Sequence, residues 1–300
     1  MQILITGGTG LIGANLIPKL KPHEITVLTR NVSMAERELG SKVTLISSLD
    51  NLHNLNEFDA VINLAGEPIV NKKWTDEQKA ILEQSRCGLT EQLVSLVHAS
   101  EFPPELFISG SAVGYYGRQG DELIDEDFNQ PFDEFSHQLC QRWEQAALKA
   151  ASETTRVCIL RTGIVITRRG GALMKMVPPF RMGLGGPIGD GQQYMSWIHL
   201  EDMLNGIIHL IEHSECQGVY NFTSPNPVTN DEFSHTLASA LHRPCLLRMP
   251  KFAMRLMMGE MADLVLYGQR VIPKRLQQSG FEFQYPELEH ALDCLSLSSL

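Results

Sequence analysis

Short apolar runs alternate with longer segments of helical periodicity over the first two-thirds of the chain. The short runs predict strands, and each is apolar almost throughout, which is typical of parallel strands covered by helices on both faces. In the longer segments, apolar residues recur every three or four positions, as on one face of a helix. The predicted strands lie at 3–6, 25–29, 43–46, 60–64, 106–109 and 157–161, and the predicted helices at 10–20, 76–99 and 135–151.

The pattern changes after about residue 166. Segments 168–171 and 178–191 are rich in glycine and proline and predict a long ordered loop, which in a compact domain is usually functional. Alternation then resumes at 195–198, 200–212, 219–222 and 231–241, and a mainly helical tail follows residue 250. We therefore expect an α/β fold: a Rossmann doubly wound parallel sheet with a smaller α/β carboxy-terminal substrate lobe. The predicted Rossmann domain comprises 1–166 and 195–224, and the lobe 167–194 and 225–300.

A glycine-rich turn directly follows the first predicted strand and opens the first predicted helix, with the sequence TGGTGLIG at 6–13. Gly7, Gly10 and Gly13 permit a tight turn, close approach to a pyrophosphate and close packing of the helix on the strand. The free N–H groups at the start of the helix would then bind the anion. The turn predicts a dinucleotide site, against the alternative of a purely structural turn.

The end of the second predicted strand indicates which dinucleotide is preferred. Sites for NAD place an acidic residue there to bind the ribose 2′-hydroxyl, whereas an arginine pairs with the 2′-phosphate of NADP. This chain has Thr29 and Arg30 at that point, and no acidic residue follows before Glu36. The sequence thus predicts NADP(H), with a solvated arginine at a strand end as the alternative.

Composition and charge exclude several other classes. The 300 residues are 43% hydrophobic and 20% charged, a mix typical of globular proteins, and the formal charge of −10 argues against a nucleic-acid partner. The amino terminus does not resemble a signal peptide, and no run approaches the roughly 18 apolar residues of a membrane span. Six scattered cysteines without a CxxC pair predict reduced thiols, no metal site and a cytoplasmic location. A monomer and a homodimer both remain open.

Several motifs together resemble a known family. TGGTGLIG, the Asn63–Gly66 segment and the Ser109–Ser111 segment are similar to extended short-chain dehydrogenases/reductases of the epimerase/dehydratase branch. SAVGYYG at 111–117, PPFRMGLGGPIGDG at 178–191 and SWIHLEDM at 196–203 resemble the atypical YfcH-type epimerase family proteins more specifically. The resemblance covers essentially the whole chain. It implies an NADP-binding Rossmann domain that carries a small substrate lobe.

The resemblance also implies which residues would bind the cofactor. Arg86 stands where extended enzymes have an asparagine, and it would either contact a cofactor phosphate or bridge a helix and a loop. The adenosine phosphate would lie at Thr29 and Arg30, and the nicotinamide near Thr162 and Gly163. The remaining predicted contacts are Gly7, Thr9, Gly10, Leu11, Ile12, Gly13, Leu64, Ala65 and Gly66.

The catalytic pair of the family is missing. Extended enzymes use a Tyr-x-x-x-Lys pair, in which the lysine lowers the pKa of the tyrosine. Counting back from Glu144, the lysine position holds Cys140 and the tyrosine position Ser136, and neither can do this work. The resemblance offers Ser111 as a contact to a substrate oxygen.

Two tyrosines could replace the missing phenol. Tyr115 and Tyr116 follow Ser111 on the same loop, so either could present a phenol to the cleft, or both could pack beneath the loop. Three functions therefore stay open for an unidentified small-molecule substrate or ligand. They are an NADP(H)-dependent oxidoreductase acting on a small carbonyl or hydroxyl compound, a nucleotide-sugar epimerase or dehydratase, and a non-catalytic NADPH-binding sensor.

Overall fold

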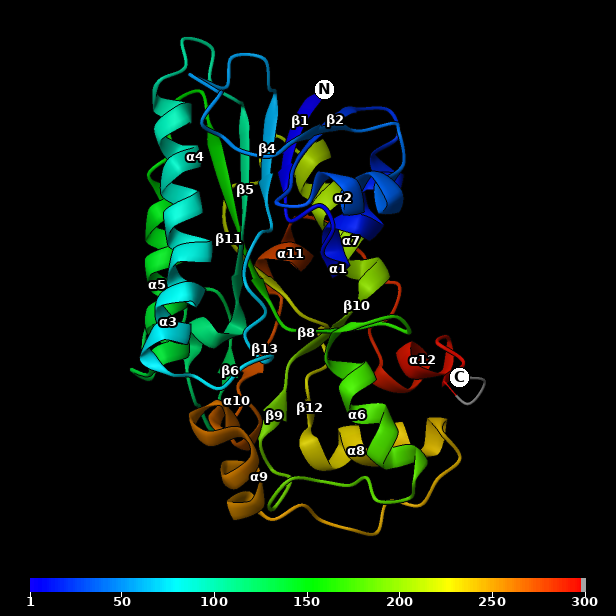
Figure 1. Cartoon of the computed structure of the whole chain (residues 1–300). Coiled ribbons are helices and arrows are strands. Elements are labelled where there is room, and N and C mark those ends of the chain that lie inside the picture. The colour runs from blue at the N-terminus through cyan, green and yellow to red at the C-terminus, as the bar shows by residue number, and fades with distance from the viewer. Residues whose placement is uncertain (298–300) are drawn as a thin grey trace.

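A seven-stranded parallel sheet forms the centre of the protein in the computed structural model, which describes residues 1–297 (Figure 1). All neighbouring strands pair in parallel, and the order reverses beside the first strand, as in a doubly wound Rossmann sheet. The predicted fold class is confirmed. Across the sheet the strands are β11 (Gly218–Phe222), β7 (Arg156–Thr162), β5 (Leu106–Ala112), β4 (Ala60–Asn63), β1 (Gln2–Thr6), β2 (Glu24–Leu28) and β3 (Thr44–Ile46).

Helices cover both faces of the sheet, which explains why its strands are apolar throughout (Figure 1). Successive residues of β1 enter different cores: Ile3 and Ile5 pack in one, and Leu4 packs in the other. The core around Ile3 includes α1 (Leu11–Leu16) and α7 (Leu200–Glu212). The core around Leu4 includes α4 (Leu89–His98) and α5 (Phe135–Leu148), and α3 (Asp76–Glu83) lies on that side as well.

A second lobe lies below the sheet in Figure 1 and has its own hydrophobic core. That core brings together β8 (Ile164–Ile166), α6 (Gly171–Arg181), β10 (Trp197–His199), α8 (Asn230–Ala240) and α12 (Leu288–Asp293). Nearby lie β9 (Tyr194–Met195), which pairs with β12 (Val228–Thr229), together with α9 (Lys251–Met258) and α10 (Asp263–Leu266). Leu276 and Phe281, although far along the chain, pack with the sheet core. The two cores are therefore interleaved in sequence.

The loop predicted at 178–191 begins later than expected. Pro178 and Pro179 lie inside α6, so the prediction was wrong for its first residues. Both prolines remove backbone N–H donors. One face of this helix, however, buries Leu173, Val177 and Phe180 completely or nearly so, and this burial outweighs the lost hydrogen bonds.

Other parts of the chain also differ from the sequence prediction. The helix α2 (Val32–Leu39) was not predicted, and it buries only Ala35. The strand predicted at 195–198 is divided into β9 and β10, which pair with different partners. In the described residues, no helix is both long enough and apolar enough to cross a membrane.

The junction of β10 with α7 depends on a neutral histidine. His199 is 5% exposed, and its Nδ1 accepts a hydrogen bond from the backbone N–H of Glu201, which caps the helix. Burial lowers the pKa of His199 to about 4. Protonation would remove the acceptor and place a charge in a buried site.

We therefore predict that the protein loses stability as the pH falls from about 6.5 toward about 4. In this range His199 is protonated in the unfolded chain but stays neutral in the folded protein, so protons favour unfolding. A shift of this size corresponds to about 3 kcal/mol at most. Urea unfolding of the protein and of His199→Asn at a series of pH values would test this, since asparagine also caps helices without titrating. Parallel stability curves for the two proteins would contradict the prediction.

Candidate cofactor and active site

The predicted cofactor residues gather at one edge of the sheet. The glycine turn follows β1, Thr29 and Arg30 follow β2, and Leu64–Gly66 follow β4. Thr162 ends β7, and Gly163 comes next. Because the strands are parallel, all these segments lie at the carboxyl edge, and the glycine turn lies where the strand order reverses. Ligands of doubly wound sheets bind at this point.

The glycine turn has the geometry that its spacing predicts. Gly7 has a φ of +70°, and a side chain there would meet the backbone of Leu64 at 2.7 Å. A Cβ on Gly13 would lie 2.4 Å from the Gly7 carbonyl oxygen, so only glycine lets α1 pack this closely. The helix begins at Leu11, and its N-cap Gly10 supplies no side-chain cap. The first-turn N–H groups are thus left for an anion, which fits a pyrophosphate.

The two predicted residues after β2, Thr29 and Arg30, have different environments. Thr29 is buried, and its hydroxyl accepts a hydrogen bond from the backbone N–H of Asn31, which in turn caps α2. Arg30 is exposed, and no acidic residue between 1 and 297 pairs with it. Arg30 is therefore a cation at this edge that could pair with the 2′-phosphate of a bound cofactor without competition from a carboxylate.

Arg86 bridges a helix and a loop. Its guanidinium donates to the carbonyl oxygen of Glu67 at 2.9 Å and to that of Leu82 at 3.2 Å. A Cβ on Gly66 would lie 3.0 Å from its Cζ, so Gly66 is small because the arginine packs against it. The structure shows the bridge between helix and loop, and a contact of Arg86 with a cofactor phosphate stays a prediction. Arg86 holds the loop that follows β4 and gives it a fixed position.

Thr162 and Gly163 connect the sheet to the second lobe. The backbone N–H of Gly163 donates to the carbonyl oxygen of Phe222, and a side chain at this glycine would meet the Ser196 carbonyl oxygen at 2.5 Å. The Thr162 hydroxyl contacts its own strand through the carbonyl oxygen of Leu160. The backbone at the end of β7 is thus tightly packed at the place where the nicotinamide was predicted.

A buried ion pair lies directly behind Ser111. The Ser111 hydroxyl donates to Glu144 Oε1 at 2.7 Å, and Arg161 binds both carboxylate oxygens of Glu144 at 2.8 Å. All three side chains are nearly inaccessible. Burial alone would lower the pKa of Arg161, but the hydrogen bonds and charge of Glu144 outweigh it and raise the pKa above its ordinary value. Neither residue was predicted as part of the site from the sequence, although an arginine inside an apolar strand indicates a buried partner.

The two candidate tyrosines differ in where they place their hydroxyls. Tyr116 is 0% exposed, donates to Asn221 Oδ1 at 2.7 Å and accepts from Arg161 Nη1 at 3.1 Å. Burial raises the pKa of Tyr116 to about 12. Tyr116 therefore packs beneath the loop and does not present a phenol to the cleft.

Tyr115 is the candidate that remains. It is half-buried, and the guanidinium carbon of Arg161 lies 3.4 Å from the centre of its ring. Its hydroxyl forms no hydrogen bond with another residue in the described part of the chain. Arg161 thus contacts both Tyr115 and, through Glu144, Ser111. One buried cation positions the two remaining candidate catalytic residues.

The positions of the missing catalytic pair are occupied by uncharged, buried groups. The Ser136 hydroxyl donates to Glu134 Oε1 at 3.0 Å, and burial raises the pKa of Cys140 to about 12. A Cβ on Gly114 would lie 3.4 Å from Ser136 and 3.7 Å from the Cys140 sulfur. The short helix 113–116 that carries Tyr115 therefore packs directly on these two positions.

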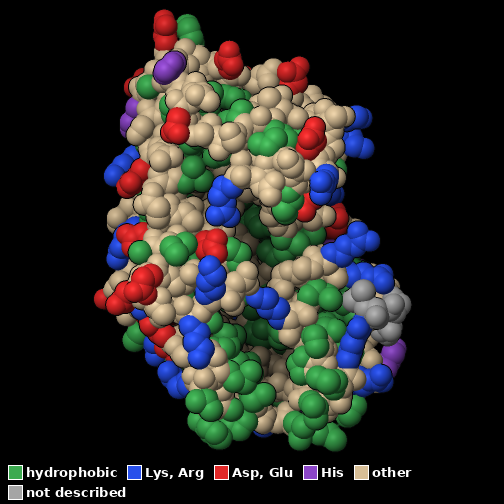
Figure 2. Space-filling view, viewed as in Figure 1, with side chains coloured by type: hydrophobic (Ala, Val, Ile, Leu, Met, Phe, Trp, Pro, Cys, Tyr) green, Lys and Arg blue, Asp and Glu red, His purple; other side chains and the backbone are tan. Residues whose placement is uncertain are grey.

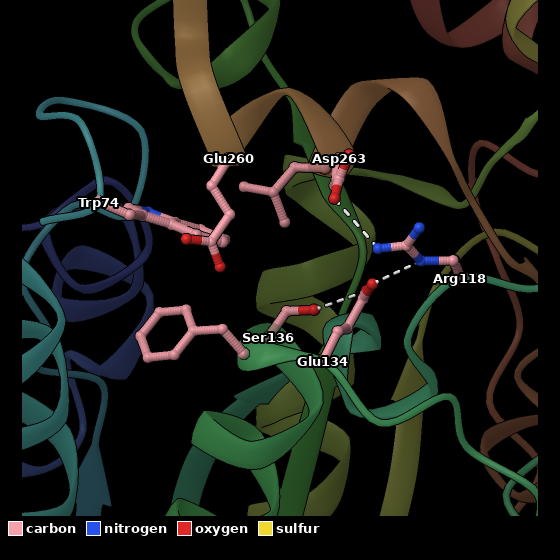
Figure 3. A pocket seen from close by; sticks show the side chains of 8 residues that line it. Trp74, Arg118, Glu134, Ser136, Glu260 and Asp263 are labelled. Carbon is pink, nitrogen blue, oxygen red and sulfur yellow. Dashed lines mark hydrogen bonds and ion pairs between the residues drawn. The ribbon is translucent and has the colours of Figure 1, made fainter. Parts of the chain in front are cut away.

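A cavity of about 120 Å³ opens beside Ser136, where the sheet domain meets the second lobe (Figure 3). Sequence reasoning missed it, because its walls come from segments almost 200 residues apart and no motif joins them. The space-filling view shows a deep cleft between the two parts of the molecule (Figure 2). The cavity is lined by Trp74, Arg118, Glu134, Phe135, Ser136, Glu260, Asp263 and Leu264. In the described residues, no group of three or more His, Cys, Asp or Glu side chains could hold a metal ion.

A doubly wound parallel sheet with an uncapped glycine turn at its switch point defines a Rossmann protein of the dinucleotide-binding class. Comparison with known families agrees, since residues 3–222 match the NAD dependent epimerase/dehydratase family and 249–295 match a domain of unknown function, DUF1731. The chain belongs to the NAD dependent epimerase/dehydratase family. The resemblance inferred from the motifs is thus confirmed.

Several relatives match over nearly the full length. The chain is 39% identical to the chloroplastic epimerase family protein SDR39U1 homologue of Arabidopsis thaliana, covering 97% of this chain and 86% of that protein. It is 38% identical to an epimerase family protein of Staphylococcus epidermidis, with 98% of each covered. The crystal structure of human epimerase family protein SDR39U1 with NADPH superposes with a TM-score of 0.91 at 34% identity and 99% coverage of both chains.

More distant structures share only the fold. The UDP-glucuronic acid 4-epimerase of Bacillus cereus, solved with UDP-glucuronic acid and NAD, has a TM-score of 0.77 at 17% identity, with 99% of this chain and 98% of that chain covered.

We predict that Arg161→Met costs about 3–5 kcal/mol of stability, because it leaves the Glu144 carboxylate buried without its cation. Arg142→Met is the matched control, since Arg142 pairs with Glu83 at the surface, where such pairs contribute about 1 kcal/mol or less. Urea unfolding measures both. Equal losses of unfolding free energy in the two variants would show that the buried pair contributes no more to stability than the surface pair.

Proposed function

We propose that the protein is an NADP(H)-dependent oxidoreductase that transfers hydride to or from a small carbonyl or hydroxyl compound. The observation that carries the proposal is the shared edge of the sheet. The uncapped glycine turn, with its free N–H donors, lies at the same carboxyl edge as Ser111 and the loop with Tyr115. A dinucleotide bound along this edge would bring its reactive ring near both side chains.

NADP(H) is the preferred cofactor in this proposal. Arg30 offers a guanidinium without an ion-pair partner among the described residues, in the position where the 2′-phosphate would lie. The human SDR39U1 structure contains NADPH, and this chain matches it closely over its whole length. Gly7, Thr9, Gly10, Leu11, Ile12 and Gly13 would hold the pyrophosphate side of the cofactor, with Leu64, Ala65, Gly66, Thr162 and Gly163 around the remainder.

The hydrogen bonds of the site support different roles for the two candidate catalytic residues. When bound, the cofactor supplies or accepts the hydride at the substrate carbon. Reduction of a carbonyl also needs a proton at the oxygen, and the Tyr115 hydroxyl has no competing hydrogen bond in the described structure. The Ser111 proton is donated to Glu144, so its oxygen can accept a hydrogen bond from a substrate hydroxyl. Ser111 thus orients the substrate, and Tyr115 exchanges the proton.

A non-catalytic NADPH sensor is the second candidate. The observation in its favour is that Ser136 and Cys140 replace the Tyr-x-x-x-Lys pair and are both buried. In that case cofactor binding would change the contacts between the sheet domain and the second lobe. A sensor would need different affinities for NADPH and NADP⁺, because a ligand that binds two states equally shifts neither.

Calorimetric titration with NADPH, NADH, NADP⁺ and NAD⁺ tests the cofactor assignment. We expect NADPH to bind at least about tenfold more tightly than NADH, because a charge-assisted contact contributes roughly 1.5–3 kcal/mol. Arg30→Ala should remove this preference and leave NADH binding unchanged. Lys21→Ala, which removes an exposed cation ahead of β2, is the control. If Arg30→Ala still binds NADPH more tightly than NADH by the same factor, Arg30 does not contact the 2′-phosphate.

Steady-state oxidation of NADPH with a panel of small aldehydes and ketones tests the reaction. We expect Tyr115→Phe and Ser111→Ala each to lower kcat/KM at least about tenfold while NADPH affinity stays the same. Tyr285→Phe, which changes a tyrosine of the second lobe, should leave the rate unchanged. Tight NADPH binding without turnover of any compound would instead favour the sensor.

A further inference from the structure

The cavity beside Ser136 has the size and walls of a site for one small ring. Trp74 lines the cavity (Figure 3), and the centre of its ring lies 4.9 Å from that of Phe135 in an edge-to-face arrangement. Leu264 is a third apolar lining residue. Its volume of about 120 Å³ is close to that of an engineered cavity, of about 150 Å³, that binds benzene. Because Ser136 packs against Gly114, the cavity adjoins the short helix 113–116, which carries Tyr115 and directly follows the strand of Ser111.

The single arginine of the cavity is already neutralised. Arg118 Nε lies 2.9 Å from Glu134, and Arg118 Nη2 lies 3.0 Å from Asp263 (Figure 3). Its guanidinium carbon also lies 4.3 Å from the ring centre of Tyr267 and 4.7 Å from that of Phe132. Two carboxylates and two aromatic rings thus surround this cation, so an incoming anion would have to displace a carboxylate to reach it.

The remaining charges of the cavity also disfavour an anion. Three carboxylates line it, from Glu134, Glu260 and Asp263, and the cations beside them are all paired with these carboxylates. Arg255, for example, binds Asp263 at 2.9 Å, so an anion would find no unpaired cation among these residues. The nearby Lys79 binds Glu260 at 2.7 Å and lies 5.0 Å from the ring centre of Phe135. A phosphate or carboxylate placed here would lose its water and face these oxygens, whereas aromatic faces attract neutral rings and cations.

We propose that this cavity is the substrate-selective part of the active site and that it accepts neutral or cationic aromatic alcohols and aldehydes but rejects anionic ones. The inference rests on the proposed oxidoreductase function and specifies its substrate class. It also separates the protein from enzymes that act on nucleotide sugars, because a diphosphate would carry two negative charges into the carboxylate-lined cavity.

Trp74 provides a local signal for binding. The other two tryptophans, Trp143 and Trp197, are 7% and 0% exposed and do not line the cavity, whereas Trp74 forms one of its walls. The full-length protein, saturated with NADPH, would be titrated with benzyl alcohol, 4-(aminomethyl)benzyl alcohol and 4-carboxybenzyl alcohol. These alcohols cannot accept hydride, so binding is observed without turnover. Quenching of Trp74 emission, absent in Trp74→Phe, reports occupancy of the cavity.

We expect the neutral and cationic alcohols to bind at least about tenfold more tightly than the carboxylate. Glu260→Gln should strengthen binding of the carboxylate about threefold or more, because Lys79 loses its partner and the cavity loses a negative charge. Glu153→Gln, an exposed substitution outside the cavity, is the matched control and should change neither value.

The proposal is overturned if the carboxylate binds as tightly as the neutral alcohol, or if none of the three compounds quenches Trp74. It is also overturned if Glu260→Gln and Glu153→Gln behave alike. Turnover is a separate measurement with the matching aldehydes. Selective binding without NADPH oxidation would support the cavity and contradict the proposed oxidoreductase function, whereas NADPH oxidation that is indifferent to substrate charge would do the reverse.

Discussion

The buried ion pair between Arg161 and Glu144 holds several elements at the carboxyl edge of the sheet together. It connects β7 to α5, and its members also hold Ser111 on β5 and Tyr116 on the adjoining loop. Tyr116 continues the network to Asn221 on β11. A charge can be buried this deeply only where its partners satisfy it fully, so each of these elements is held in one position relative to the others. The geometry at the carboxyl edge of the sheet depends on that requirement.

The same pair changes how the missing catalytic lysine is understood. In the extended enzymes that the sequence resembles, the cation of the active site comes from the helix that here is α5. In this protein that helix contributes a carboxylate, Glu144, and in the proposed active site the cation is Arg161 of the neighbouring strand. Because Arg161 lies against the face of the Tyr115 ring and is bound to Glu144, its charge is fixed in place. In the proposed site, the guanidinium beside Tyr115 therefore belongs to the sheet and not to the helix, and it is paired with Glu144.

Local patterns predicted the central sheet and the glycine turn of the molecule, but little of the candidate active site. All seven strands of the central sheet follow from apolar runs, and the glycine turn follows from spacing, because both depend on neighbours in sequence. The helix through Pro178 was missed because burial of Phe180 and its companions is a tertiary effect. Tyr115 and Tyr116 are adjacent residues of the same type, so the sequence cannot tell which hydroxyl is buried. Only the packing shows that Tyr116 is buried and Tyr115 is not. The cavity between Trp74 and Asp263 depends on contacts between distant segments, which no short motif records.

The interleaving of the two cores has a consequence for how the chain is made. The second core needs α6, then α8, and finally α12, which ends at residue 293 of 300. During synthesis the sheet domain has almost all its strands long before the last of these helices leaves the ribosome. Until then, the apolar faces of α6 and α8 lack their final partner and stay open to chaperones and proteases. A chain truncated within α12 would therefore reach a lower level in the cell, even though α12 carries none of the predicted cofactor residues.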